Sequence, residues 1–146
     1  MNNLYSVNRI EGYQKIVEDI LENLKEDSGI LLCEGDLGAG KTTFARIFIR
    51  HLCKNPCEEV PSPTFTLVQY YQTPTGRDIH HYDLYRLHHP DELTEIGFDA
   101  SLNKRGVVIV EWPEKLGHYM PNCYYRLHFK EISDDMREVR VTKYDG

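Results

Sequence analysis

The sequence predicts a single α/β domain in which helices flank a central sheet of mixed parallel and antiparallel strands. Three observations lead to this prediction. A short apolar strand runs into a Gly-rich loop at Gly35–Thr42, and a helical pattern follows the loop. A hairpin pattern occupies residues 64–87, and two further strand patterns close the chain. Because a βα unit and hairpins share one chain, the expected class is a P-loop NTPase-like domain with a mixed sheet.

The amino-terminal part of the chain predicts a helix, a strand and a second helix. Apolar residues recur at intervals of three and four from Ile10 to Leu24, which indicates an amphipathic helix. After Gly29, the apolar run Ile30–Cys33 predicts a short buried strand. The second helix is expected from about Lys41 to Leu52. Strand, loop and helix in this order are the context that a phosphate-binding loop requires.

The middle of the chain predicts a β-hairpin. Residues 64–72 are rich in β-branched and aromatic side chains, which favour a strand. The segment Thr73-Pro74-Thr75-Gly76 is typical of a turn. Residues 79–87 are then expected to form the returning strand of this hairpin.

The remaining chain predicts one short helix and three strands. Residues 91–96 have a helical pattern that Gly97 ends, and residues 107–110 form the most apolar strand pattern. Residues 124–132 and 138–144 are predicted strands on either side of a polar turn, and residues 138–142 alternate polar and apolar side chains as a half-exposed strand would. We therefore expect two strands here, the last of them half-exposed.

Length and composition limit the class of protein. The 146 residues are expected to form one domain, 1–146. Apolar runs are far shorter than the ~20 residues of a membrane helix, so no membrane span is predicted. The net charge of −6 disfavours a surface that binds DNA or RNA directly. Four cysteines without a C-x-x-C pair, and no secretory signal, indicate a cytoplasmic protein with reduced thiols.

The phosphate loop Gly35–Thr42 matches G-x-x-x-x-G-K-[ST], which predicts that ATP and Mg²⁺ bind here. Its glycines allow backbone N–H groups to turn toward phosphates at the start of a helix. Lys41 is expected to face solvent and neutralise the β and γ phosphates, and Thr42 to place its hydroxyl on Mg²⁺. A Gly-rich turn that merely caps a helix is the alternative. The residues expected to contact the nucleotide are Asp36, Leu37, Gly38, Ala39, Gly40, Lys41, Thr42, Thr43, Thr64 and Trp112.

Two acidic residues follow strand patterns and are candidates for the metal and the attacking water. Glu111 ends the apolar run Val107–Val110, and Asp83 lies near the end of the segment 79–83. We assign Asp83 to Mg²⁺, and Glu111 to water activation or to an outer position at the metal. The opposite assignment stays open, so the candidate catalytic residues are Lys41, Asp83 and Glu111, and the candidate metal ligands are Thr42, Asp83 and Glu111.

Other polar and aromatic residues near these segments have two interpretations each. Thr64 lies among prolines that restrict its loop, and it is either a sensor of the γ-phosphate or part of a turn. Arg86 either counters transition-state charge or forms an ion pair with an acid such as Asp83. Trp112 either stacks on a ligand or packs. Four histidines are interpreted as sheet and loop residues rather than ligands: His80, His81, His88 and His89.

Four sequence blocks together resemble the bacterial TsaE (YjeE) family: Gly35–Phe44, Pro61–Leu67, His81–Leu87 and Glu111–Glu114. The resemblance covers about residues 30–116, whereas the first helix and the last two strands match only in pattern. The family commonly has a Thr-containing segment near the adenine at its amino-terminal end. This sequence has Ser6-Val7-Asn8 in that region, so the residues that contact the adenine stay open.

The resemblance implies a role in the threonylcarbamoyl modification of the adenosine beside the anticodon, in tRNAs that read codons starting with A. It implies two partner proteins, TsaB and TsaD, with tRNA reached only through that complex. It also implies an ATP hydrolase that is weak alone. Lys41, Thr42, Asp83, Glu111 and Trp112 fall on functional positions of the family.

Two other functions remain compatible with the residues. A small-molecule kinase shares the phosphate loop, but it usually has a mobile lid, and no Arg-rich lid segment is present in the sequence. A nucleotide-dependent binding module would use ATP to set its conformation, without significant turnover. No arginine is an evident internal arginine finger, which favours completion of the site by a protein partner.

Overall fold

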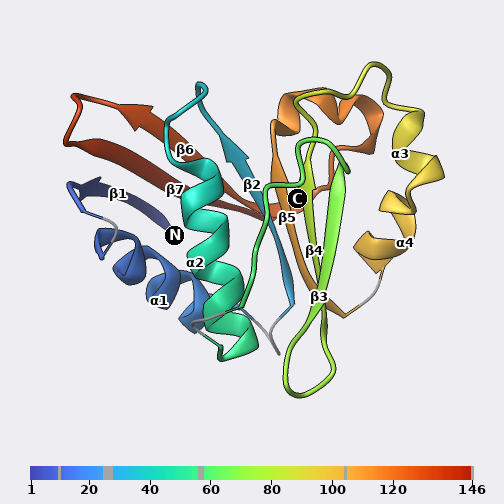
Figure 1. Ribbon diagram of the computed structural model, residues 1–146, viewed down its shortest axis with the longest axis horizontal. Helices are drawn as coiled ribbons and strands as arrows, with labels where there is room; N and C mark the ends of the chain where they lie inside the picture. Colours follow the sequence, from blue (N-terminus) through green and yellow to red (C-terminus); the bar gives the residue numbers. More distant parts are fainter. Residues whose placement is uncertain (10, 25–27, 56–57, 104, 146) are drawn as a thin grey trace.

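Within the described residues, seven strands form one sheet in the order β1-β7-β6-β2-β5-β4-β3 (Figure 1). The computed structural model describes residues 1–9, 11–24, 28–55, 58–103 and 105–145. Strand β2 is parallel to β5 and β6, and β4 is parallel to β5, whereas the β1–β7, β6–β7 and β3–β4 pairs are antiparallel. The predicted mixed sheet is therefore confirmed. The strands are β1 (Asn2–Val7), β2 (Gly29–Glu34), β3 (Val68–Gln72), β4 (Asp78–Asp83), β5 (Gly106–Glu111), β6 (Cys123–Glu131) and β7 (Arg137–Asp145).

Helices cover the two faces of the sheet in different places (Figure 1). Two long helices lie on one face, and two short helices lie on the other face beside β4 and β5. Apolar side chains therefore point from the central strands into a separate core on each face, as strand alternation requires. The helices are α1 (Gly12–Asn23), α2 (Lys41–Cys53), α3 (Glu92–Glu95) and α4 (Phe98–Asn103), with 3₁₀ turns η1 (Pro113–Lys115) and η2 (Gly117–Tyr119).

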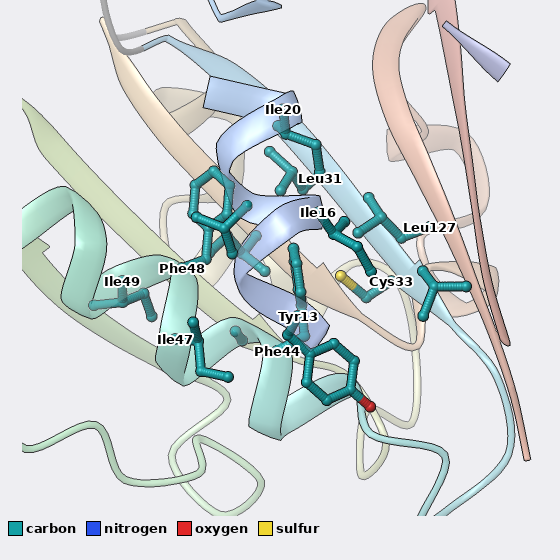
Figure 2. Close-up of a cluster of buried hydrophobic side chains, with 14 of the residues drawn as sticks. Tyr13, Ile16, Ile20, Leu31, Cys33, Phe44, Ile47, Phe48, Ile49 and Leu127 are labelled. Carbon is teal, nitrogen blue, oxygen red and sulfur yellow. The ribbon is translucent and has the colours of Figure 1, made fainter. Parts of the chain in front are cut away.

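The larger core lies between the sheet and helices α1 and α2 (Figure 2). Phe44 of α2 is completely buried, and its ring centroid lies 5.7 Å from that of Phe129 in β6. Tyr13 of α1 contacts the same two rings. This packing holds the first turn of α2 against the sheet. Full burial of one such aromatic side chain stabilises the fold by about 1.5–3 kcal/mol.

One strand was not predicted, and two predicted boundaries differ from the structure. Strand β1 was not expected, because Asn2–Val7 is mostly exposed and gains its order from pairing with β7. The expected strand over residues 64–72 begins only at Val68, since residues 63–66 form a turn. The expected strand over residues 79–87 ends at Asp83. Residues 64–67 before β3 and residues 84–87 after β4 have side chains that favour strands, but they do not pair with a neighbouring strand.

The other predicted segments form as expected, with small changes at their ends. The first helix runs from Gly12 to Asn23, and residue 10 lies outside the described part of the chain. The hairpin of β3 and β4 closes through Thr73, whose N–H donates to the Arg77 carbonyl at 2.9 Å. Helix α4 and the two 3₁₀ turns were not predicted from the sequence.

The structure also bears on the membrane and the cysteines. Across the ranges that the structure describes, no helix has the length and apolar character needed to span a bilayer. Cys33, Cys53 and Cys123 are free thiols, and Cys57 lies outside the described residues. Burial raises the pKa of Cys33 well above its usual range, so this thiol stays protonated.

Candidate functional site

The phosphate loop connects the end of β2 to the start of α2, as predicted. Gly35, Gly38 and Gly40 have φ values of 143°, 78° and 109°, which L side chains rarely adopt. A Cβ atom on Gly35 would collide with the Phe129 carbonyl, and one on Gly40 with the Tyr13 hydroxyl. The loop is therefore shaped by glycine, and the free N–H groups of α2 follow it directly.

Lys41 begins α2 and points back over the phosphate loop. Its Nζ donates to the Gly35 carbonyl and lies 3.5 Å from the centroid of the Trp112 ring. The expectation of a solvent-facing side chain is wrong, since Lys41 is only 4% exposed beneath Trp112. Burial lowers the pKa of Lys41, whereas nearby carboxylates, led by Glu111, raise it. A phosphate anion beside Nζ would relieve the cost of this partly buried charge.

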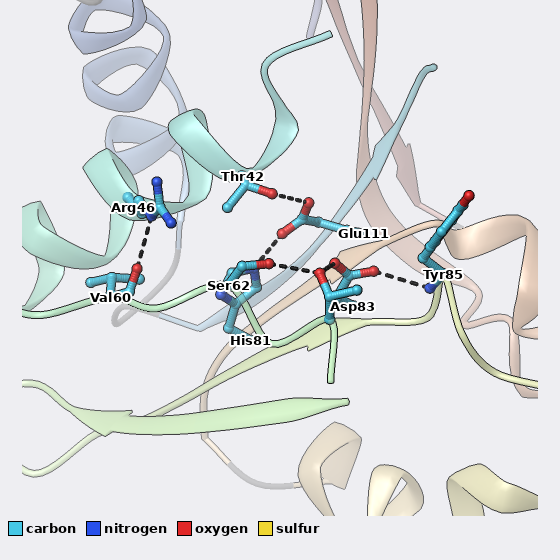
Figure 3. Close-up of polar contacts among 9 residues, drawn as sticks. Thr42, Arg46, Val60, Ser62, His81, Asp83, Tyr85 and Glu111 are labelled. Carbon is cyan, nitrogen blue, oxygen red and sulfur yellow. Dashed lines mark hydrogen bonds and ion pairs between the residues drawn. The ribbon is translucent and has the colours of Figure 1, made fainter. Parts of the chain in front are cut away.

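The two candidate acids lie side by side at the carboxyl ends of parallel strands. Asp83 ends β4, Glu111 ends β5, and the two residues are register partners on the same face of the sheet. Both are nearly fully buried, with exposed fractions of 4% and 1%. The Thr42 hydroxyl donates to Glu111 Oε1 at 2.6 Å, which links the first turn of α2 to β5 (Figure 3). The sheet register therefore brings both acids to the phosphate loop.

Thr64 reaches Asp83 from the segment before β3. Its hydroxyl donates to Asp83 Oδ2 at 2.7 Å, and the Ser62 and Thr64 hydroxyls also lie 2.7 Å apart. The segment is anchored where the Asp83 N–H donates to the Leu67 carbonyl at 3.0 Å. Thr64 is therefore both part of a turn and a neighbour of the acids, so its two interpretations are not exclusive.

His81 contacts Glu111 from the neighbouring strand β4. Sequence reasoning missed this contact. Its Nε2 lies 2.6 Å from Glu111 Oε2, and its side chain is fully buried (Figure 3). It was interpreted as a sheet residue, and it does lie in β4. The sequence did contain a signal for this contact: His81 precedes Asp83 by two residues, so both side chains lie on the same face of the strand. We call Thr42, Thr64, His81, Asp83 and Glu111 the acid cluster.

Trp112 and Tyr85 form the wall of the site opposite the phosphate loop. Their rings are tilted, with centroids 5.1 Å apart. Trp112 has a φ of 61°, a left-handed conformation that turns the chain directly after Glu111. Trp112 packs on Tyr85 and covers Lys41, whereas its stacking on a ligand stays a prediction. Tyr85 is a second residue that sequence reasoning did not select.

These side chains enclose a cavity of about 290 Å³ beside the phosphate loop. A second cavity of about 310 Å³ continues on the other side of the loop and shares Gly38, Gly40 and Thr43 with the first. Together they have the size of a site for a small organic ligand. The first is lined by Leu37, Gly38, Gly40, Lys41, Thr42, Thr43, Thr64, Asp83, Tyr85, Glu111 and Trp112; the second adds Val7, Asn8, Arg9, Tyr13, Asp134, Asp135 and Arg137.

Most of the predicted site residues line the first cavity. Asp36 and Ala39 belong to the phosphate loop without lining the cavity; Asp36 is exposed, and Ala39 is buried in the larger core. The suggested ion pair of Arg86 with Asp83 does not form among the described residues. Arg86 instead lies with Cζ 4.2 Å from the centroid of the exposed Phe65 ring.

The donor set of the cavity fits a nucleotide with Mg²⁺. Thr42, Asp83 and Glu111 present oxygen atoms, which Mg²⁺ prefers. Among the described residues, no group of three His, Cys, Asp or Glu side chains could hold a metal by itself. Mg²⁺ usually binds to one or two carboxylates together with substrate phosphates and water, and this cavity offers the carboxylates of Asp83 and Glu111.

Comparisons with known proteins point to one family. The family model described as "Threonylcarbamoyl adenosine biosynthesis protein TsaE" matches residues 7–139. A Rickettsia typhi protein named tRNA threonylcarbamoyladenosine biosynthesis protein TsaE is 37% identical over 98% of this chain and 94% of its own. The Bacillus subtilis protein of the same name is 33% identical over 88% and 78%. The crystal structure of Bacillus subtilis YdiB has a TM-score of 0.75 at 26% identity, over 99% and 87%.

Proposed function

Since the chain belongs to the TsaE family of threonylcarbamoyl adenosine biosynthesis proteins, we propose that it binds and hydrolyses ATP during this tRNA modification. One observation carries the proposal. The acid cluster brings two buried carboxylates against the first turn of α2, in the cavity beside the phosphate loop. Phosphates at the start of a helix, next to acidic residues that can hold a metal or activate water, define phosphoryl-transfer chemistry.

Binding of the phosphates is assigned to the phosphate loop. The N–H groups at the start of α2 and the Lys41 ammonium contact the β and γ phosphates. Lys41 exchanges its contacts with the Gly35 carbonyl and the Trp112 ring for these anions. Thr42 and Asp83 would hold Mg²⁺, which when bound supplies positive charge against the phosphates.

Hydrolysis is assigned to Glu111. Its carboxylate takes a proton from the water whose oxygen attacks the γ-phosphorus, while the bond to the β–γ bridging oxygen breaks and ADP leaves. Glu and Asp carboxylates are among the side chains that act as general bases in proton transfer. In the alternative assignment, Glu111 and Asp83 exchange their roles, and the variants described in the Discussion separate the two.

The nucleoside is assigned to the second cavity. This cavity adjoins the phosphate loop through Gly38, Gly40 and Thr43, so a bound nucleotide can extend from one cavity into the other. Asn8 and Arg9 line this cavity, and Asn8 belongs to the segment Ser6–Asn8, where the sequence left the residues that contact the adenine open. This assignment connects the amino-terminal part of the chain to nucleotide binding.

A protein partner is assigned the task of completing the site. Of the described residues that line the first cavity, none is arginine. An arginine supplied by a partner can raise phosphoryl-transfer rates by about 10³–10⁵-fold. We propose a complex of TsaB and TsaD as that partner, with tRNA reached only through the complex. The cytoplasmic location expected from the sequence stays a prediction.

The experiment measures phosphate release by the purified protein with ATP and Mg²⁺, with and without a TsaB–TsaD complex. Slow release alone and faster release with the complex support the proposal. Formation of a phosphorylated small molecule would identify a kinase instead. Nucleotide-dependent binding to the complex without phosphate release would identify a binding module. Full-rate hydrolysis by the isolated protein, or binding to the complex that ignores the nucleotide, would contradict the partner assignment.

A further inference from the structure

His81 has a role in the acid cluster that the proposed hydrolysis does not yet use. Its side chain is 0% exposed, and its Nε2 lies 2.6 Å from Glu111 Oε2. The other ring nitrogen, Nδ1, is buried and has no hydrogen-bond partner among the described residues. Buried polar atoms are nearly always paired, so a ring with one paired nitrogen requires an explanation. Within the part of the chain that the structure describes, the hydrogen bond to Glu111 is the polar contact that this ring makes.

The sheet register places the two side chains in contact. His81 is paired with Ile109 across the parallel β4–β5 ladder, and Glu111 follows Ile109 by two residues on the same face. The ring therefore reaches diagonally to the carboxylate from the neighbouring strand. Since β5 lies between β2 and β4 in the middle of the sheet, the pair is built on a rigid part of the fold.

We propose that His81 is a positioning residue, which holds Glu111 Oε2 so that Oε1 faces Thr42 and the phosphate cavity. Carboxylate oxygens accept hydrogen bonds, so in this arrangement Nε2 is the ring nitrogen that donates to Oε2. Glu111 Oε1 is then the oxygen available to Thr42, at 2.6 Å. This inference rests on the proposed function, because the orientation of Glu111 matters only if Glu111 acts on the nucleotide.

The physical reason for such a residue is the burial of Glu111. A buried carboxylate oxygen without a donor is costly, so without His81 the side chain rotates toward other donors or water. Rotation would remove Oε1 from its place beside Thr42. Nucleotide binding by the phosphate loop does not require that place, so His81 acts on turnover rather than on affinity.

The test compares two amides at position 81. Glutamine in His81→Gln can place its amide nitrogen near the position of Nε2, whereas the shorter asparagine in His81→Asn cannot reach Glu111. With the TsaB–TsaD complex present, we expect His81→Asn to lower kcat by about 10- to 100-fold, the usual range for residues that orient a catalytic group through hydrogen bonds. KM and the ADP dissociation constant should stay within about 2-fold of wild type, and His81→Gln should keep most of kcat.

Two controls separate positioning from simple destabilisation. Tyr82→Phe removes the buried hydrogen bond to Ser101 at 3.0 Å, on the same strand but the opposite face, and should leave kcat unchanged. In the Glu111→Gln background, adding His81→Asn should not lower kcat further. If His81 acts only through Glu111, the effects of the two substitutions on kcat are not additive. Equal loss in His81→Gln and His81→Asn, or a further loss in the double variant, would overturn the proposal.

Two measurements do not depend on hydrolysis. Crystal structures should show the Glu111 carboxylate unmoved in His81→Gln and rotated away from Thr42 in His81→Asn; an unmoved carboxylate in both contradicts the proposal. In the unmodified protein, ¹⁵N NMR should find the His81 hydrogen on Nε2, and a hydrogen on Nδ1 alone would contradict it even if a variant fails to fold. If wild type hydrolyses no ATP with the complex, the proposed function fails, while these two measurements still decide how His81 holds Glu111.

Discussion

The phosphate loop and the acid cluster lie against each other but are built in different ways. The loop is one continuous segment whose shape depends on glycines at positive φ. The acid cluster takes its side chains from α2, β4, β5 and the segment before β3, and strand register brings them together. The loop is therefore sensitive to local backbone changes. The cluster is sensitive to the loss of single polar partners in a buried site.

The difference also concerns the chemical role of each region. The loop contributes N–H groups and Lys41, which attract anions, whereas the cluster contributes carboxylates that repel them. Thr42 belongs to both regions, since it follows Lys41 and donates to Glu111 at 2.6 Å. Variants in the loop should thus change nucleotide affinity, and variants in the cluster should change turnover.

The largest effect is expected from Glu111→Gln. The amide keeps the size of the side chain but cannot accept a proton from water, and general-base catalysis contributes about 10²–10⁴-fold. We expect ATP affinity to survive and partner-stimulated phosphate release to fall by that factor. Phosphate release and binding calorimetry measure the two quantities.

The matched variant for this experiment is Asp83→Asn. If it abolishes hydrolysis and spares binding while Glu111→Gln hydrolyses at the wild-type rate, the two acids have exchanged the roles assigned above. A strong loss of ATP affinity in Glu111→Gln would contradict the assignment of affinity to the loop and of turnover to the acid cluster.

Lys41→Ala should have the next largest effect, this time on affinity. A charge-assisted contact to phosphate is worth about 1.5–3 kcal/mol, which corresponds to roughly 10- to 150-fold in the dissociation constant. The fold should persist, because Lys41 is covered by Trp112 rather than by a core cluster. Calorimetry with ATP and ADP measures the change, with Lys130→Ala on the exposed face of β6 as the control. Unchanged affinity would remove Lys41 from the phosphate site.

A smaller effect is expected from Gly40→Ala, which tests the local construction of the loop. A non-glycine residue at positive φ costs about 1–2 kcal/mol, and here the Cβ would also displace the Tyr13 hydroxyl. Gly76→Ala is the matched control, because Gly76 has a φ of 85° and open space around it. Chemical unfolding should show a larger loss of stability in Gly40→Ala, and only this variant should lose nucleotide affinity. Equal losses in both would mean that the loop tolerates a Cβ.

The smallest effect is expected from Thr64→Val, which removes the hydroxyl that donates to Asp83 at 2.7 Å. A hydrogen bond to a charged group contributes about 1.5–3 kcal/mol, but the half-exposed Thr64 allows water to replace part of it. We therefore expect a loss of about 1 kcal/mol in the free energy of unfolding, measured with denaturant. Thr64→Ser should retain the wild-type value. Identical stability of both variants would show that the turn, and not the hydroxyl, orders this segment.

Sequence reasoning succeeded for elements whose structure depends on residues that are adjacent in the chain. The phosphate loop, α2 and the apolar strand β5 were predicted because glycine spacing and apolar runs act on adjacent residues. It missed β1, whose exposed side chains carry no strong pattern, and it extended β3 and β4 beyond their paired residues. These boundaries depend on the partner strand, which a local pattern does not contain.

The sequence by itself determined the mixed α/β fold and the Gly-rich loop, and it selected Asp83 and Glu111 as candidates, since each follows from spacing along the chain. Only the tertiary structure decided that Asp83 and Glu111 are register partners, that Trp112 covers Lys41, and that His81 contacts Glu111. The physical reason is that these contacts join residues distant in the chain. Their geometry is set by strand order and register, which arise when the two cores on either side of the sheet are packed together.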